Sequence, residues 1–129
     1  MTQKEKDLLL KDLCARLPYG VKVGVINEDN EHRIVKIGEG NIGHLGKGFW
    51  KDCKPYLFPL SSMTEEQVYN NPIGFSQMLT IKADRDWENI TINRRAYYKL
   101  VDWFNKNHFD YRGLIEEGLA IDATGLNIY

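Results

Sequence analysis

The amino-acid sequence predicts an α+β fold, in which a small antiparallel sheet packs with an N-terminal amphipathic helix and a long C-terminal helix. Two apolar stripes with helical spacing lie near the two ends of the chain, and valines alternate with other residues just after the first stripe. A helical stripe and a sheet face are each buried against another element, so we expect both helices to cover one sheet face. The expected core residues are Leu10, Leu13, Leu17, Val23, Val25, Leu100 and Phe104.

The length and composition predict one globular domain, residues 1–129. With 129 residues, of which 43% are hydrophobic and 27% charged, the chain has the size and balance of a single folded unit. Lys and Arg number 17 against 18 Asp and Glu, so no global field attracts nucleic acid, and a nucleic-acid site would be a local patch. No apolar run approaches the roughly 20 residues of a membrane span. The charged N-terminus is unlike a signal peptide, so we expect a cytoplasmic protein without a membrane partner.

The first apolar stripe predicts a helix that begins near Thr2 and ends near Leu17. Thr2 and Glu5 form a capping-box pattern, and Pro18 disfavours helical geometry at Leu17. Cys14 belongs to the stripe and is expected to be a small buried hydrophobe, whereas Lys11, Asp12 and Arg16 lie on the opposite side. The stripe consists of Leu10, Leu13, Cys14 and Leu17.

The segment after this helix predicts a β-hairpin. Residues 21–26 alternate with the two-residue period of a strand, and the polar cluster 27–30 reverses the chain into a second strand over 33–37. The aromatic stretch 49–58 predicts a third strand, which Pro55 and the following Pro59 confine to an edge or to a short piece.

The middle of the chain predicts one helix and one further strand. Thr64 and Gln67 form a second capping-box pattern, so a short helix is expected to start there and to stop at residues 70–74. Residues 77–83 alternate weakly and predict a strand.

The second apolar stripe predicts the strongest helix of the chain, from Asn93 as N-cap through Asn107. Its apolar positions are Ala96, Tyr97, Leu100, Trp103 and Phe104. In the tail, we expect a helical turn over 113–117 that Gly118 stops, followed by an extended piece over 119–121.

The glycine-rich stretch 38–48 matches nucleotide-binding patterns only in form. Residues 38–43 fit GxGxxG, yet residues 44–48 contain two more glycines and open no helix to hold a pyrophosphate. A phosphate-binding loop is excluded because Asn41 stands where its first glycine belongs and Gly48 replaces the magnesium-binding Ser or Thr. The stretch is interpreted as a flexible hairpin tip or a wide surface loop, and the alternative is a loop that orders on contacting a partner.

The sequence indicates neither a metal site nor a cofactor. Cys14 and Cys53 lack the paired spacing of zinc ligands, and the three histidines fall in separate segments.

A basic face on the C-terminal helix is a candidate nucleic-acid site. Arg94, Arg95 and Lys99 share the outward side with Tyr98, which combines phosphate contact with a ring for stacking. The alternative is a solvated face on which neighbouring-turn pairs, such as Asp102 with Lys106, neutralise the charge.

The short run 108–112 is a second candidate site. His108 near Asp110 could act as a general base, and Arg112 beside Tyr111 could hold an anionic group. In the structural alternative, His108 continues the apolar side of the helix, Asp110 caps the next turn, and Arg112 pairs with a carboxylate. No nucleophile is evident in the segment, so no catalytic residue is assigned.

Three stretches resemble a group of small uncharacterised proteins of gut anaerobic bacteria, their prophages and other mobile elements. They are residues 8–23 (LLLKDLCARLPYGVKV), residues 54–67 (KPYLFPLSSMTEEQ), and residues 107–115 (NHFDYRGLI) with 118–120 (GLA). The resemblance implies no activity, cofactor or catalytic residue. Together with the missing catalytic set, it favours a small non-catalytic interaction protein of a phage or mobile element, whose partner is another protein. A nucleic-acid-binding domain and an unrecognised hydrolase are the alternatives.

Overall fold

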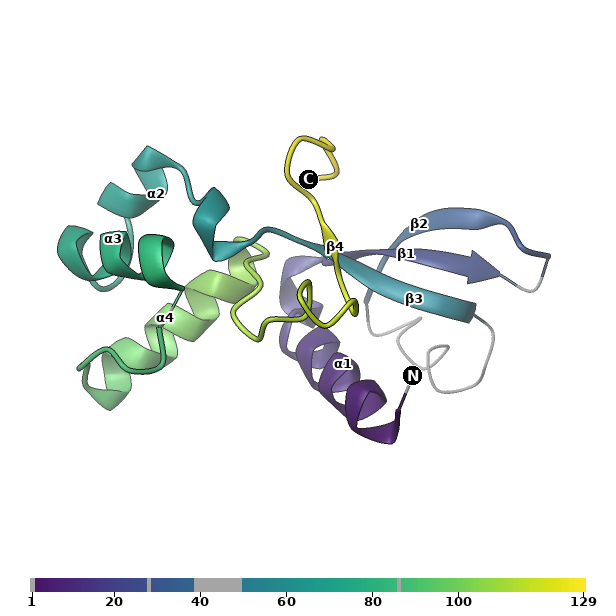
Figure 1. Cartoon of the computed structure of the whole chain (residues 1–129), viewed down its shortest axis with the longest axis horizontal. Coiled ribbons are helices and arrows are strands. Elements are labelled where there is room, and N and C mark those ends of the chain that lie inside the picture. The colour runs from purple at the N-terminus through teal and green to yellow at the C-terminus, as the bar shows by residue number, and fades with distance from the viewer. Residues whose placement is uncertain (1, 28, 39–49, 86) are drawn as a thin grey trace.

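The computed structural model describes residues 2–27, 29–38, 50–85 and 87–129, and has an α+β fold. Figure 1 shows α1 beside the sheet, with α2, α3 and α4 grouped beyond one end of it. The helices are α1 (Gln3–Ala15), α2 (Glu65–Tyr69), α3 (Phe75–Asp84) and α4 (Arg94–Lys106), with short 3-10 turns η1 (Leu17–Tyr19) and η3 (Leu60–Ser62). The strands are β1 (Lys22–Asn27), β2 (His32–Lys36), β3 (Trp50–Leu57) and β4 (Ile121–Asp122). None of the described helices is long and apolar enough to cross a bilayer.

Helix α1 begins with the expected capping box but buries a different stripe. The Glu5 backbone N–H donates to Thr2 Oγ1 at 3.1 Å, and the Thr2 N–H donates to Glu5 Oε1 at 2.9 Å. Leu10 is 48% exposed and Cys14 is exposed, so both predictions of burial were wrong. Leu17 is only partly buried. The buried positions of the helix and its C-cap are Leu9, Asp12, Leu13 and Arg16, which again follow helical spacing. The polar pair that the sequence placed outside is therefore inside.

The sheet is mixed rather than antiparallel. Strand β1 pairs antiparallel with β2, as the expected hairpin, and also with β3, whereas β3 pairs in parallel with β4. The strand order is β2-β1-β3-β4. Because β4 pairs only with Tyr56 and Leu57, the part of β3 that includes Pro55 has no described strand on that side. A proline is tolerated there because no ladder bond to that side is required.

The two helical stripes are buried in separate hydrophobic clusters, so the predicted common core is wrong. Helix α1 covers one sheet face, where Leu13 packs with Val23 and Val25. Leu100 and Phe104 of α4 instead pack with α2 and α3. The first cluster comprises Leu9, Leu13, Val21, Val23, Val25, Ile37, Cys53, Leu57, Leu114, Leu119 and Ala120. The second comprises Leu60, Met63, Val68, Met78, Ile81, Trp87, Leu100, Phe104, Phe109 and Tyr111.

The misassigned segment 77–83 explains why α4 does not pack on the sheet, as the sequence predicted it would. These residues lie in α3 instead of a strand, and Met78 and Ile81, one helical turn apart, are fully buried. Helix α2 begins at Thr64 with the expected capping box. Helices α2 and α3 therefore both cover the apolar stripe of α4. As predicted, Asn93 is the N-cap of α4, and its Oδ1 accepts from the Ala96 N–H at 2.8 Å.

The chain after α4 is not helical and returns to the sheet. Residues 114–118 form turns, with the Leu119 N–H donating to the Leu114 carbonyl at 2.9 Å. The extended piece expected over 119–121 is strand β4, shifted by a residue or two toward the C-terminus. Because Leu114 and Leu119 belong to the first cluster, this tail joins the helical group to the sheet.

Candidate functional site

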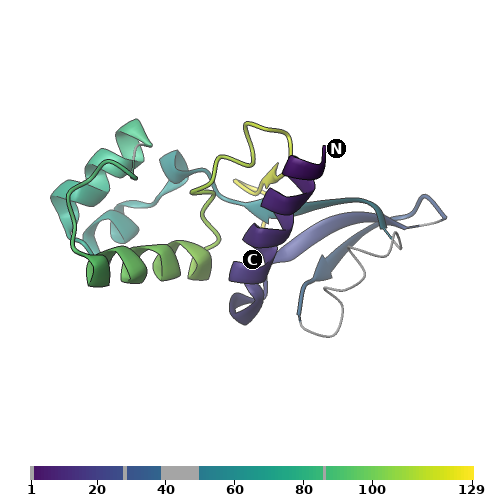
Figure 2. The ribbon, with the colours of Figure 1, turned by 90° about the horizontal axis from the view of Figure 1, so that it is seen from below.

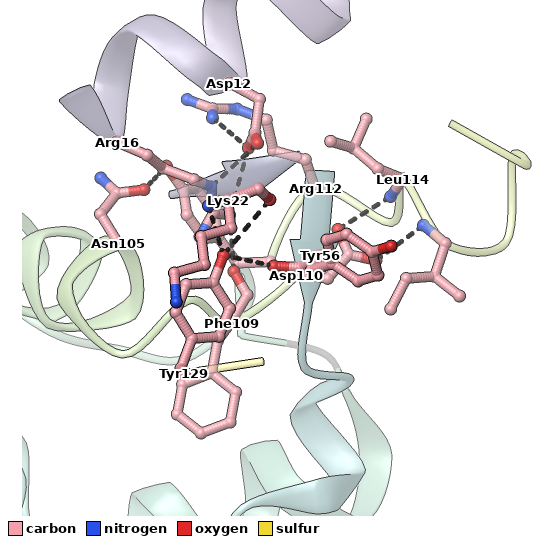
Figure 3. A network of polar contacts seen from close by, with 12 residues as sticks. Asp12, Arg16, Lys22, Tyr56, Asn105, Phe109, Asp110, Arg112, Leu114 and Tyr129 are labelled. Carbon is pink, nitrogen blue, oxygen red and sulfur yellow. Dashed lines mark hydrogen bonds and ion pairs between the residues drawn. The ribbon is translucent and has the colours of Figure 1, made fainter. Parts of the chain in front are cut away.

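A buried ionic network ties α1 to the segment that follows α4 (Figure 3). The Arg16 side chain is fully buried, and its Nε donates to Asp12 Oδ2 at 2.8 Å. Arg16 Nη2 donates to Asp12 Oδ1 at 3.2 Å and to the Phe109 carbonyl at 2.6 Å. A single buried guanidinium thus holds its own helix and the distant chain together.

Arg112 and Tyr111 extend this network toward the surface. Arg112 Nη1 donates to Asp12 Oδ1 at 2.8 Å, so one carboxylate serves two guanidinium groups. Both guanidiniums lie over the Tyr111 ring, with the Arg112 Cζ at 4.7 Å and the Arg16 Cζ at 5.2 Å from its centroid. The Tyr111 hydroxyl donates to Asn105 Oδ1 at 2.8 Å. Five polar side chains at the junction of the two clusters are therefore fixed in place.

Asp110 is a capping residue of the turn that follows it. Its Oδ1 accepts from the Leu114 N–H at 2.8 Å and its Oδ2 from the Ile115 N–H at 2.9 Å. Burial raises the pKa of the Asp110 carboxyl, and the two backbone hydrogen bonds oppose this rise. Both oxygens are thus engaged by backbone donors, as the structural alternative expected.

His108 is stacked on the C-terminal residue and forms no pair with Asp110. The His108 backbone has a φ of 61°, and its ring lies 3.7 Å from the Tyr129 centroid at an interplanar angle of 10°. Burial, followed by the positive charges of Arg16 and Lys22, lowers the pKa of His108 to about 4. Its Nδ1 has no hydrogen-bond partner among the described residues. A base oriented by a carboxylate, which a hydrolase at this position needs, is therefore not assembled.

The lowered pKa of His108 predicts a loss of stability in mild acid. The pKa is about 4 in the folded state against an ordinary value of 6.5, so the unfolded chain binds more protons between these values. Stability is therefore present above pH 6.5 and falls as the pH drops toward 4. We expect a loss of about 1 kcal/mol between pH 7 and pH 5, because partial exposure of the ring weakens the full effect.

Urea unfolding at several pH values checks this prediction. His108→Asn is the comparison, because asparagine tolerates the positive φ and does not titrate in this range. The variant should show a flatter dependence on pH. An unchanged slope would contradict the assignment to His108. Asp110 cannot account for the loss, because its raised pKa makes stability rise as the pH falls.

The candidate basic face is solvent-exposed along α4. Arg94, Arg95, Tyr98 and Lys99 are all exposed, and the Tyr98 side chain is 63% accessible. The alternative pair of Asp102 with Lys106 is not among the ion pairs of the described residues. Asp102 Oδ1 instead accepts from the Tyr19 hydroxyl of η1. The four residues therefore share one exposed helix face. The residues of the 108–112 run, in contrast, each contact a different structural partner and do not form a common site.

An aromatic groove of about 460 Å³ lies between α1 and α4, next to the basic face. Trp87 forms its fixed wall: the Trp87 Nε1–H donates to the Tyr111 carbonyl at 2.8 Å, and the ring stacks on Tyr97 with centroids 5.6 Å apart. Tyr98 stands at the opening. The groove is lined by Lys11, Trp87, Glu88, Tyr97, Tyr98, Val101, Asp102, Asn105, Tyr111 and Arg112.

Sequence reasoning missed this groove because its walls come from distant segments. Lys11 lies on α1 and Trp87 in the loop before α4, and neither belongs to a motif. The available signal was a tryptophan in a polar loop, where a large apolar ring requires a partner.

Within the described ranges, no group of three or more His, Cys, Asp or Glu residues could hold a metal ion. The glycine-rich stretch lies almost wholly outside the described residues, since positions 39–49 are not among them.

Comparison with family models, curated proteins and solved structures finds no match to this chain. The resemblance to proteins of gut anaerobes and their prophages stays a prediction. Functional inference therefore depends on the geometry of the groove and its neighbouring residues.

Proposed function

We propose that the protein is a cytoplasmic, non-catalytic interaction protein of a phage or other mobile element, whose aromatic groove binds a segment of another protein. The observation that carries the proposal is the convergence of Trp87, Tyr97, Tyr98 and Tyr111 on one groove with Arg112 and Lys11 beside them. Tryptophan, tyrosine and arginine are the residue types that dominate binding energy at protein interfaces.

The aromatic residues of the groove differ in how firmly they are held, and this suits binding. Trp87 is 6% exposed and fixed by its hydrogen bond, so little side-chain entropy is lost when a partner contacts it. Tyr98 is 63% exposed and touches only the neighbouring Tyr97 ring among the described aromatic contacts. The groove therefore has a fixed wall, Trp87, and an exposed aromatic side chain at its opening, Tyr98, which suits a site that closes on a partner.

The charges around the groove favour an acidic partner segment. Lys11 and Arg112 line the groove, and Arg94, Arg95 and Lys99 lie on the adjoining helix face. The acidic residues in the lining are Glu88 and Asp102, and one Asp102 oxygen already accepts from Tyr19. The lining itself is balanced in charge, so the positive excess lies on the adjoining helix face. That face complements a segment that carries carboxylates next to an apolar side chain.

We expect Tyr98→Ala to weaken partner binding about tenfold or more, because tyrosine is among the residue types that contribute most to binding energy when a partner buries them. Tyr69→Ala is the matched control, since Tyr69 is 60% exposed and lies on α2 outside the groove. Tagged wild type and both variants are used to capture proteins from nuclease-treated extract of the native host, with quantitative mass spectrometry as the measurement.

A protein retained by the wild type and by Tyr69→Ala, but depleted with Tyr98→Ala, supports the proposal. Equal retention by all three, or no protein above background, would contradict it. Circular dichroism of both variants verifies that the fold is kept.

Nucleic-acid binding through the basic face of α4 is the second candidate function. The observation in its favour is that Arg94, Arg95, Tyr98 and Lys99 are exposed together, and that their side chains make no hydrogen bond or ion pair within the described part of the chain. The net charge of -1 argues against it, because a nucleic-acid-binding protein usually carries a positive field.

Gel shifts with duplex and single-stranded DNA and RNA at low salt test this candidate. Arg94→Glu with Arg95→Glu should abolish binding, and Lys4→Glu at the start of α1 should not. Binding that weakens steeply with salt indicates phosphate contact. The absence of retardation at micromolar protein would exclude this function.

A further inference from the structure

The side chain of Tyr129 is inserted at the end of the ladder between β1 and β3. That ladder ends with Val23 opposite Pro55. In the same register, Lys22 and Tyr56 would form the next pair. The Tyr129 hydroxyl lies between them instead: it accepts from the Lys22 N–H and donates to the Tyr56 carbonyl, both at 2.8 Å (Figure 3). A side-chain hydroxyl thus stands where two strands would otherwise bond directly.

Two further rings contact the Tyr129 ring. His108 stacks on it with centroids 3.7 Å apart, and Phe58 lies at 5.9 Å with an interplanar angle of 52°. Burial lowers the pKa of His108 to about 4 and raises the pKa of Tyr129 to about 12, so a neutral imidazole faces a protonated phenol near neutral pH. Only the protonated phenol can both accept and donate as this hydroxyl does. We call these surroundings the phenol slot, which is formed by Lys22, Tyr56, Phe58 and His108.

The walls of the phenol slot are held by contacts that do not involve Tyr129. The Phe58 N–H donates to the His108 carbonyl, and the Asp110 N–H donates to the Phe58 carbonyl, both at 2.8 Å. The other two residues of the slot lie in β1 and β3, which their ladder holds together. A site whose walls are fixed in this way is preformed, so we expect it to persist when its occupant leaves.

The segment that carries Tyr129 is attached mainly at its two ends. Figures 1 and 2 show this yellow segment on the side of the sheet away from α1. At one end the Ala123 N–H donates to a β3 carbonyl at 2.8 Å, and at the other Lys22 Nζ donates to the Ile128 carbonyl at 2.7 Å. Residues 124–127 between these ends are all exposed. Because a segment with few buried contacts opens at low cost, we expect Tyr129 to leave its slot while the rest of the protein stays folded.

We infer that the phenol slot is a tyrosine-recognition site, which the chain fills with its own Tyr129 and which a tyrosine of a partner protein fills when residues 123–129 open. The stacking and both hydrogen bonds are made by the phenol side chain, so a tyrosine of another segment can satisfy them as well. Tyr129 has the advantage of a high effective concentration, because it is tethered to the slot. The slot shares no residue with the aromatic groove, so each site stands or fails separately.

Titration of the ¹⁵N-labelled full chain with para-cresol tests the site by nuclear magnetic resonance. Tyr129→Ala empties the slot, and we expect this variant to bind para-cresol with a Kd of ~0.1–1 mM, as suits a ligand of this size. Tyr129→Phe keeps a competing ring but loses both hydrogen bonds, so its affinity should be intermediate. The wild type should bind at least about tenfold more weakly than Tyr129→Ala, because its slot is mostly closed. The shifted amides should include Lys22, Phe58 and His108.

Controls separate phenol recognition from the filling of an apolar gap. Toluene lacks the hydroxyl and 4-methylanisole cannot donate, so each should bind Tyr129→Ala about tenfold more weakly than para-cresol does. Combining Tyr129→Ala with His108→Asn removes the stacking ring and should weaken para-cresol binding about fivefold. Tyr69→Ala removes an exposed tyrosine of α2 and should bind para-cresol no better than the wild type.

A short peptide with one central tyrosine tests recognition of a partner segment. At millimolar concentration it should shift the same amides of the wild type, and the peptide with phenylalanine in place of tyrosine should bind about tenfold more weakly. The amide spectrum verifies the fold of each variant. If Tyr129→Ala does not fold, the comparison of Tyr129→Phe with the wild type decides.

Three results would overturn the inference: no shift of the slot amides in either Tyr129 variant, equal binding of para-cresol and toluene, or equal binding of para-cresol by the wild type and the variants. A fourth is a wild-type dimer that forms as the protein is concentrated and is lost in Tyr129→Phe. Size-exclusion chromatography would detect it, and it would replace the partner protein with a second copy of the chain.

Discussion

Asp12→Ala lowers the free energy of unfolding by about 3–5 kcal/mol, because it leaves a buried guanidinium without its carboxylate. Arg16 is fully buried and makes two of its hydrogen bonds to Asp12. Water cannot replace the lost partner at that depth, so the charge stays uncompensated. Arg112 loses the same partner, but its side chain is 18% exposed and can be hydrated. Urea unfolding followed by circular dichroism measures the loss.

Two further variants separate burial from charge pairing as the cause. Glu31→Ala removes the exposed ion pair with Arg33 and should cost less than about 1 kcal/mol. Asp12→Leu combined with Arg16→Met removes both buried charges, and should be more stable than Asp12→Ala. If the double replacement is the less stable protein, the network contributes mainly through its hydrogen bonds, such as that to the Phe109 carbonyl, and the argument from an uncompensated charge fails.

The local start signals of the helices were predictable from the sequence. Thr2 and Thr64 form capping boxes and Asn93 caps α4, because each pattern depends only on residues within one turn. The β1–β2 hairpin was predictable for the same reason, since its two strands and its turn are adjacent in the chain.

The buried face of α1 could not be predicted because it depends on a distant partner. Leu9, Asp12, Leu13 and Arg16 follow helical spacing as well as the leucine stripe does. What selects them is the contact of Asp12 with Arg112, which lies 100 residues away in the sequence. Hydrophobicity alone placed this charged pair in solvent, whereas the pair is satisfied inside the protein.

Segment 77–83 was misassigned because weak alternation and helical spacing coincide in a short run. Met78 and Ile81 are buried at a spacing of three, and no sequence signal excluded the two-residue period. Because the sequence predicted a strand for this segment, no helix other than α2 was predicted that could pack against α4. The sequence-based fold therefore placed α4 on the sheet and did not include the second hydrophobic cluster.

The candidate site was predictable in part. Capping by Asp110 and pairing of Arg112 with a carboxylate were inferred from residue type, and the exposed face of α4 followed from its periodicity. The groove itself depends on tertiary contacts of Trp87, for which neighbouring sequence carries no pattern.

Phe104→Ala lowers the free energy of unfolding by about 3–5 kcal/mol, because it opens a cavity at the centre of the second hydrophobic cluster. The Phe104 ring is fully buried. It stacks on Tyr111 with centroids 5.4 Å apart, and meets Trp87 edge-on at 5.6 Å and Phe109 edge-on at 6.3 Å. These aromatic contacts add to the burial of its apolar surface. Urea unfolding measures the loss, with Phe75→Ala as control: Phe75 is 42% exposed and stacks on Tyr69, so we expect a loss below about 1.5 kcal/mol.

The same replacement also tests whether the two clusters unfold together. The second cluster holds Trp87 and Tyr111, and Tyr111 is in turn held beneath Arg16, so a cavity at Phe104 weakens both the groove and the ionic network. Hydrogen exchange of the β1 amides should therefore accelerate in Phe104→Ala as well as that of the α4 amides. Exchange that accelerates in α4 while β1 stays protected would show that the helical group opens alone, and that the network joins the clusters without coupling their stability.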